Sequence, residues 1–305
     1  MSPLAYRVEC RTKLKHMSTV RFTLFFCLFI TLAGVTHAQN DSTNWHAIEE
    51  VFERPGTIQD QYFKISFPRS DLYVTIDGVQ IAPALALTSW FGFMPNGSDV
   101  MMMGDLVLTE SEVPAVESKL EEQGLQITAL HNHLIGESPA VKYVHIEGSG
   151  EATTVARKLR SVLALTGTPM TTTMPPSDGT DWSMVESIIG VKGQVKGHVL
   201  QMSLPRAQKV TENEMEIPPF LGTATALNFE MIGDKTATTG DFVLIASEVN
   251  PVVTALRDNG IIVTAIHNHM FNESPRLFML HFWAYGALTE VAHGLRTALD
   301  RVDLK

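Results

Sequence analysis

The sequence predicts an α+β fold built from two tandem copies of one unit, each a largely antiparallel sheet with packed helices. The first observation is a repeat: ALHNHLIGESP at 129–139 returns as AIHNHMFNESP at 265–275, with seven residues matched at an offset of 136. The second is that strand-like and helix-like patterns alternate in the same order in both copies, each ending in β-α-β-β-α. Together they favour a duplicated mixed fold.

The repeat extends well beyond this motif. The matched pairs are Trp45 with Trp182, Arg69 with Arg206, Asp105 with Asp241, Glu112 with Glu248, Gly124 with Gly260, and His145 with His281. One unit of about 130 residues occurs twice, which indicates a duplication rather than a solenoid. We place repeat unit 1 at 45–165 and repeat unit 2 at 182–302. The Thr- and Pro-rich segment 166–181 between them is typical of a linker.

Residues 1–38 have the pattern of a secretory signal peptide. Basic residues precede FTLFFCLFITLAGV, an apolar run too short to span a bilayer comfortably, which ends at Ala38. Translation starts at Met1 or at Met17, and both give the same mature chain. Cys27 lies inside the apolar run, so it does not suit lipid attachment. We expect an exported, soluble protein, periplasmic or extracellular and not lipid-anchored.

Composition excludes several classes of function. The only two cysteines, Cys10 and Cys27, lie in the predicted leader, so the mature chain has no disulfide or thiol chemistry. The formal net charge is −10 and becomes more negative without the basic leader, which disfavours nucleic acid as a partner. No second long apolar stretch predicts a membrane span. The oligomeric state is left open.

The elements are predicted in the same order in each unit. Asn44 and Asp181 are N-cap candidates for a short opening helix. In unit 1, alternation and β-branched or aromatic content then predict strands at 62–67, 72–76, 86–93 and 105–109. Helices follow at 112–124 and 248–260, with Ser111 and Ser247 as caps and a closing glycine in each. The remaining segments are strands at 125–134, 142–148, 261–270 and 278–284, and helices at 154–163 and 289–299.

The repeated motif has the donors of a metal site. Residues two apart on a strand point the same way, so the two histidines of each His-Asn-His share one face. The following turn adds a glutamate, and the next strand returns a third histidine. The candidate metal ligands are His131, His133, Glu137, His145, His267, His269, Glu273 and His281. Such a set suits Zn, Mn or Fe without selecting among them. It forms two sites, or the two sets face each other across one.

Other interpretations compete with metal binding. The second is a polar network in which Asn132, Asn268 and the Ser-Pro turns hold each hairpin in register. The third is a metal-free catalytic site. Asp105 and Asp241 join the site or form a turn, and we favour the turn.

Two further features are ambiguous. Arg69 and Arg206 could bind an anionic ligand, and a buried salt bridge explains them equally well. The run Met101–Met103 could suggest copper, but unit 2 has Ala237-Thr238-Thr239 there, which favours a core or edge strand.

These motifs together resemble a known family. Ser-x-Pro-Arg, Gly-Asp with the Ser-Glu-Val helix, Thr-Ala-[Leu/Ile]-His-Asn-His with Glu-Ser-Pro, and a strand bearing His are similar to the LppY/LpqO-like family of bacterial secreted proteins and lipoproteins. The resemblance covers nearly all of 45–302 and implies export. It implies no activity, because the family is defined as a domain of unknown function.

Three functions follow from these patterns. We favour a binding module that takes a metal ion or a small-molecule ligand in the repeated His set. The alternative is a metal-dependent periplasmic hydrolase in which Glu137 or Glu273 is ligand or general base. A structural envelope protein, with the His set as a polar hairpin network, is the third.

Overall fold

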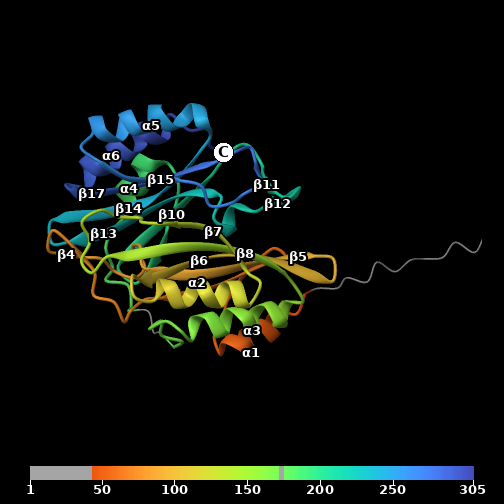
Figure 1. Cartoon of the computed structure of the whole chain (residues 1–305). Helices are drawn as coiled ribbons and strands as arrows, with labels where there is room; N and C mark the ends of the chain where they lie inside the picture. Colours follow the sequence, from red (N-terminus) through yellow and green to blue (C-terminus); the bar gives the residue numbers. More distant parts are fainter. Residues whose placement is uncertain (1–42, 172–174) are drawn as a thin grey trace, which may run out of the picture. The chain divides into compact units, whose positions relative to one another are not determined.

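The computed structural model describes residues 43–171 and 175–305 (Figure 1). The predicted signal peptide, with Cys10 and Cys27, lies outside the described residues, as do residues 172–174 of the predicted linker. Two six-stranded antiparallel sheets form the centre of the described part. Helices cover the outer face of each sheet, giving the layer order helix, sheet, sheet, helix (Figure 1). The mixed α+β fold with two repeated, mostly antiparallel units is confirmed.

Unit 1 supplies the first sheet and three helices. In chain order they are α1 (Trp45–Phe52), β1 (Thr57–Gln59), β2 (Tyr62–Pro68), β3 (Thr75–Ile76), β4 (Val79–Gln80), β5 (Thr88–Asn96), β6 (Asp99–Thr109), α2 (Val113–Glu122), β7 (Gln126–His131), β8 (Val141–Gly150) and α3 (Ala152–Leu163). The sheet order is β1-β2-β5-β6-β8-β7, so β7 lies at one edge, and β3 and β4 pair separately.

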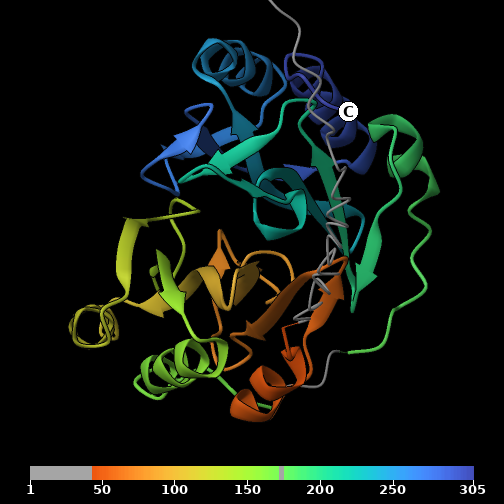
Figure 2. The same cartoon turned by 90° about the vertical axis from the view of Figure 1, so that its right-hand side faces the viewer.

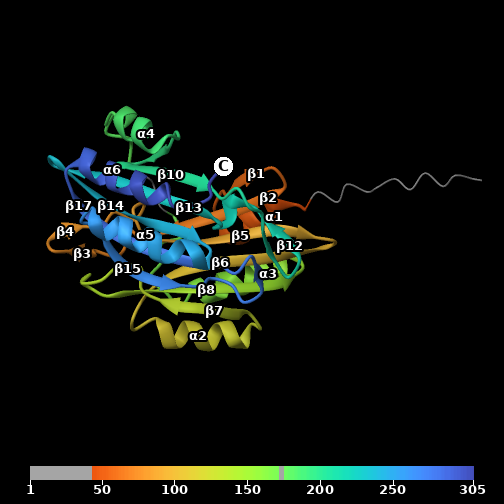
Figure 3. The same cartoon turned by 90° about the horizontal axis from the view of Figure 1, so that it is seen from above.

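Unit 2 repeats this plan with small additions (Figure 2). Its elements are α4 (Ser183–Ile189), β9 (Gln194–Lys196), β10 (Val199–Pro205), β11 (Val210–Glu212), β12 (Met215–Ile217), η1 (Pro219–Leu221), β13 (Ala224–Ile232), β14 (Lys235–Leu244), α5 (Ala246–Asp258), β15 (Ile262–His267), β16 (Glu273–Ser274), β17 (Phe278–Gly286) and α6 (Leu288–Leu299). The sheet order is β15-β17-β14-β13-β10-β9, and β16 joins β11 and β12 in a three-stranded sheet. Helices α5 and α6 cover the second sheet (Figure 3).

Alternation along the central strands creates the layers. On β6, Met102 and Leu106 pack against the helices of unit 1, whereas Met101 and Met103 point to the opposite face. There they pack with residues of unit 2 such as Met279. Because both faces are buried, the methionine run is core, as predicted, and not a soft-metal site. None of the described helices has the length and apolarity needed to cross a membrane.

Two helix caps differ from the prediction. Ser111 does not cap α2, and Ser247 lies inside α5. Glutamates close these turns instead: Glu112 Oε2 accepts from the Thr109 amide at 2.7 Å, and Glu248 Oε2 accepts from the Ile245 amide at 2.9 Å. The closing glycines are confirmed, since Gly124 and Gly260 have φ of 67° and 72°. The strand predicted at 72–76 shortens to β3.

Candidate metal centre

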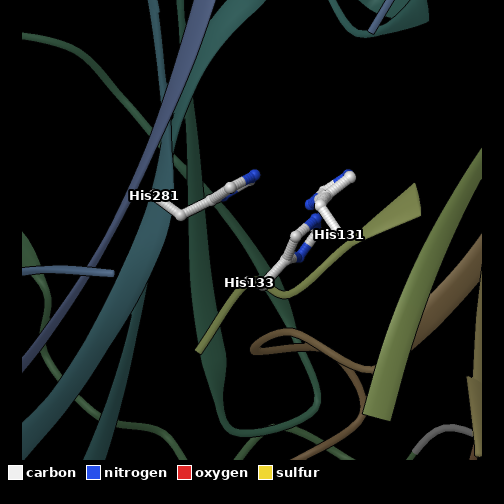
Figure 4. Close-up of side chains that lie close together, drawn as sticks. All are labelled: His131, His133 and His281. Carbon is white, nitrogen blue, oxygen red and sulfur yellow. The ribbon is translucent and has the colours of Figure 1, made fainter. Parts of the chain in front are cut away.

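The six motif histidines of both units meet in the layer between the two sheets. In unit 1, His131 ends β7, His133 follows it, and His145 lies on β8. Their repeats are His267, His269 and His281. Figure 4 shows His131 and His133 of unit 1 and His281 of unit 2 pointing toward one another. The two sets therefore face each other across a single cluster, which the sequence left open.

Two aspartates reach the same layer from the neighbouring strands. Asp105 on β6 lies directly opposite His145 on β8, and Asp241 on β14 lies opposite His281 on β17. On each edge strand a bulge shifts the register, between Ile127 and Ala129 in β7 and at the equivalent place in β15. The donors thus come from three adjacent strands of each sheet.

The glycine before each aspartate is required by close packing. A Cβ on Gly104 would lie 2.7 Å from the Trp90 carbonyl oxygen, and one on Gly240 would overlap the Ala226 carbonyl oxygen. Real Cβ atoms do not approach backbone this closely, so no other residue fits without moving the adjacent strand. The repeated Gly-Asp therefore belongs to the middle of a strand, and the turn that we favoured is wrong.

The histidine rings stack in pairs that join one unit to the other. Ring centres are 3.5 Å apart for His131 and His267, 3.8 Å for His133 and His281, and 3.7 Å for His145 and His269. Planes within each pair differ by 22° to 27°. Because His133 corresponds to His269 and His145 to His281 in the repeat, the second and third pairs are equivalent to each other. This is expected when a pseudo-twofold axis relates the two units.

Backbone carbonyls orient several rings. Nδ1 of His131 lies 3.2 Å from the Asn132 oxygen, Nδ1 of His267 lies 3.2 Å from the Asn268 oxygen, and Nδ1 of His281 lies 3.0 Å from the Gly240 oxygen. A carbonyl only accepts, so Nδ1 donates and Nε2 keeps its lone pair. This is the usual second contact of a metal-binding histidine.

The inward-facing atoms lack protein partners. Nε2 of all six motif histidines is buried and makes no hydrogen bond with any described residue. The same holds within 43–171 and 175–305 for Oδ1 of Asp105 and of Asp241. Buried polar atoms are nearly always hydrogen-bonded, so eight such atoms in one cluster require another explanation.

Spacing within the cluster suits metal ligands better than hydrogen bonds. Asp105 Oδ2 is 3.9 Å from Nε2 of both His133 and His145, and Asp241 Oδ2 is 3.8 Å from Nε2 of His269. These distances exceed a hydrogen bond. Two ligands on one ion, with bonds of about 2.1 Å, lie about 3.0 Å apart at right angles and about 4.2 Å apart when opposite.

Burial holds the cluster in its uncharged form. Desolvation lowers the pKa of His131 to about 3 and of His267 to about 4, and it lowers the pKa of the other four histidines well below the usual value. Desolvation likewise raises the pKa of Asp105 to about 7, partly offset by Lys64, and raises that of Asp241. Neutral imidazoles are the form that binds metal.

The predicted glutamates lie outside this cluster. Glu273 accepts from Arg276 Nη1 at 2.9 Å and from the Leu277 amide at 3.1 Å. Glu137 is not among the described groups whose ligand atoms lie within 4.8 Å of one another, and neither is Glu273. Those groups contain Asp105 and Asp241 instead. The recurrence of Gly-Asp at the same offset was the sequence signal for them.

Arg69 and Arg206 lie in buried salt bridges. Arg206 Nη1 donates to Glu248 and to the Val243 carbonyl, both at under 3 Å. Arg69 pairs with Glu112 at 2.9 Å and with Asp71 at 2.8 Å. Both guanidinium groups are about 1% exposed. The buried salt bridges are therefore present in both units, and they occupy the terminal guanidinium nitrogens of both arginines.

Comparisons with known proteins identify a family without an activity. No curated protein matches the sequence. Among solved structures, the double-ringed trimeric shell protein MSM0271 of the RMM microcompartment shares 10% identity, with 68% of this chain and 84% of that one covered and a TM-score of 0.20. The trimeric bacterial microcompartment shell protein PduB shares 11% identity, with coverages of 81% and 89% and a TM-score of 0.20. EtuB from Clostridium kluyveri shares 9%, with coverages of 81% and 89% and a TM-score of 0.19.

Likenesses at these TM-scores support no conclusion about fold or role. The sequence itself is more informative, because one family model matches it twice, at residues 46–165 and 183–301. The chain belongs to the family described as Domain of Unknown Function (DUF1259).

Proposed function

We propose that this protein binds transition-metal ions at a composite site between its two repeat units. The observation that carries the proposal is the set of six buried Nε2 atoms, from both units, that contact no hydrogen-bond partner in the described residues. Asp105 and Asp241 complete the donor set. Imidazole and carboxylate donors without thiolate suit Zn, Mn or Fe.

The same observation favours metal binding over the polar-network alternative. A network that holds hairpins in register would join the imidazoles to hydrogen-bond partners, whereas the Nε2 atoms have none among residues 43–171 and 175–305. Stacked neutral imidazoles also gain little from one another. Bound metal would give the unpartnered Nε2 atoms the contacts that they lack.

The hydrolase alternative has less support. That alternative uses Glu137 or Glu273 as the general base. The carboxylate of Glu273 instead forms a salt bridge with Arg276. We therefore favour a binding module that takes a metal ion, exported through the N-terminal leader, and assign no catalytic role to either glutamate. Kinship with the LppY/LpqO-like proteins is part of the same proposal.

Elemental analysis of protein purified without a polyhistidine tag or chelator tests this function. We expect stoichiometric metal in the wild type and its loss in the His131→Ala/His267→Ala double variant. The matched control is His46→Ala/His198→Ala, whose side chains are 74% and 44% exposed outside the cluster. The control should keep its metal. Metal-free wild type after metal-replete expression and re-addition would refute the proposal.

A further inference from the structure

The cluster holds more donors than one ion uses. Six imidazoles and two carboxylates converge, whereas a zinc ion takes four ligands and an octahedral ion six. The repeat divides the eight donors equally, with Asp105, His131, His133 and His145 in unit 1 and their equivalents in unit 2. The ligand atoms of each aspartate lie within 4.8 Å of two histidines of its own unit, whereas His131 also belongs to groups that contain histidines of unit 2.

Ring spacing indicates which histidines share an ion. With bonds of about 2.1 Å, two imidazoles on one ion have ring centres about 4.6 Å apart at 90° and about 5.3 Å apart at 109°. Within unit 1, His131 is 5.1 Å from His133 and 5.0 Å from His145. Within unit 2, His267 is 4.9 Å from both His269 and His281. These within-unit pairs have the spacing of two ligands on the same ion.

The stacked pairs between units do not have the spacing of two ligands on the same ion. Their centres, 3.5 to 3.8 Å apart, are too close for two rings that converge on one ion. Nε2 is without a partner in both rings of each pair, so rings stacked this closely can each bind an ion of their own, at two points about as far apart as the rings. Dinuclear metal sites in proteins hold their ions about 3.5 to 4 Å apart, which matches this stacking distance.

From this geometry we propose, building on the proposed function, that the cluster holds two metal ions side by side, one bound mainly by each unit. Asp105 with His133 and His145 binds the first ion, and Asp241 with His269 and His281 binds the second. His131 and His267, which stack on each other across the units, complete the two ligand sets. His269 and His281 lie 6.4 Å apart, which suits ligands nearly opposite each other on a five- or six-coordinate ion. Mn²⁺ and Fe²⁺ adopt such geometries more readily than Zn²⁺, which prefers four ligands.

Titration of metal-free full-length protein with Mn²⁺ tests the pair of ions. We expect two equivalents bound per chain, and an exchange-coupled electron paramagnetic resonance signal in place of the six lines of an isolated ion. The coupling needs no variant, so it does not depend on whether a substituted chain folds. One equivalent with a six-line signal would overturn the pair but leave the proposed function standing, whereas no bound Mn²⁺, Fe²⁺ or Zn²⁺ would overturn both.

A second comparison assigns the ions to the units. In Asp105→Ala/His145→Ala we expect one equivalent of Mn²⁺ and a six-line signal, because the unit 2 donors remain. Asp241→Ala/His281→Ala should give the same result from the other unit. Loss of both ions in each variant, with unchanged circular dichroism, would contradict the division of donors between the units.

Discussion

The two units present the same donors to the cluster but differ in what surrounds them. Beside His133 and His281, the ring of Tyr143 lies 3.3 Å from that of His133, and Trp283 packs in the same hydrophobic cluster as Tyr143. At the equivalent positions of the other repeat, Met279 replaces Tyr143 and Glu147 replaces Trp283. One side of the centre is thus closed by aromatic rings.

The pair His145 and His269 lies beside a small cavity instead. Both histidines line a cavity of about 10 Å³, enough for roughly one water molecule, together with Glu147, Trp90 and Thr128. Glu147 is 7% exposed, and its Oε2 has no hydrogen-bond partner among the described residues. The two units therefore present equivalent histidines and aspartates, while the residues around the stacked pairs differ.

Acid should destabilise the folded protein through the buried neutral histidines that both units share. The histidines are neutral when folded but protonate near pH 6.5 when unfolded, so their contribution to stability falls as the pH drops from 6.5 toward the folded pKa values of about 3 and 4. The raised pKa values of Asp105 and Asp241 act oppositely, but two carboxyls oppose six imidazoles. Denaturant unfolding of metal-free protein should show a loss of several kcal/mol between pH 7 and pH 5. A flat profile would contradict the burial of neutral histidines.

Removing the glutamate from each buried arginine salt bridge should give the next largest loss of stability, and the loss should differ between the two units. Glu248→Ala leaves Arg206 buried without a carboxylate, which should cost about 3 to 5 kcal/mol. Glu112→Ala leaves Arg69 with Asp71, so its cost should be smaller by at least about 1 kcal/mol. Unfolding in guanidinium chloride measures both variants. Equal losses would show that Asp71 does not compensate.

Glu147, which lines the cavity beside His145 and His269, gives the smallest effect. Burial, with repulsion from Glu212 and Glu273, raises the pKa of Glu147 to about 6, so ionisation destabilises the folded chain above that pH. Glu147→Gln should stabilise metal-free protein by about 2 kcal/mol at pH 8 and by less than half of that at pH 5. Thermal unfolding at the two pH values measures this. A gain that is independent of pH would mean that the charge is already compensated.

Local sequence patterns predict most of the helices and strands and identify the six histidines. They do not establish that the histidines of the two units contact each other. Periodicity and turn residues act within about ten positions, so β7, β8, β15 and β17 were visible in the sequence. The docking of two sheets depends on contacts between residues more than a hundred positions apart, such as His131 and His267. No single-strand pattern encodes that contact.

The sequence favours a turn over the cluster for Asp105 and Asp241 for a related reason. The sequence suggested a strand only at 105–109, which placed Asp105 at its start and made a turn plausible. The strand β6 begins at Asp99, because the methionines before Asp105 are buried on both faces and show no alternation. Glu137 and Glu273, which are nearer to His-Asn-His in the sequence, were chosen as ligands instead.

The position of the donors between two sheets has a consequence for kinetics. Each sheet is covered by its own helices, and the cavity beside Glu147 has room for little more than one water molecule. Under the proposed function, an ion held there would leave slowly, at a rate set by the separation of the two units rather than by the strength of its bonds. Chelators in solution would have to wait for that separation, so the protein would retain its metal through brief changes in the supply outside.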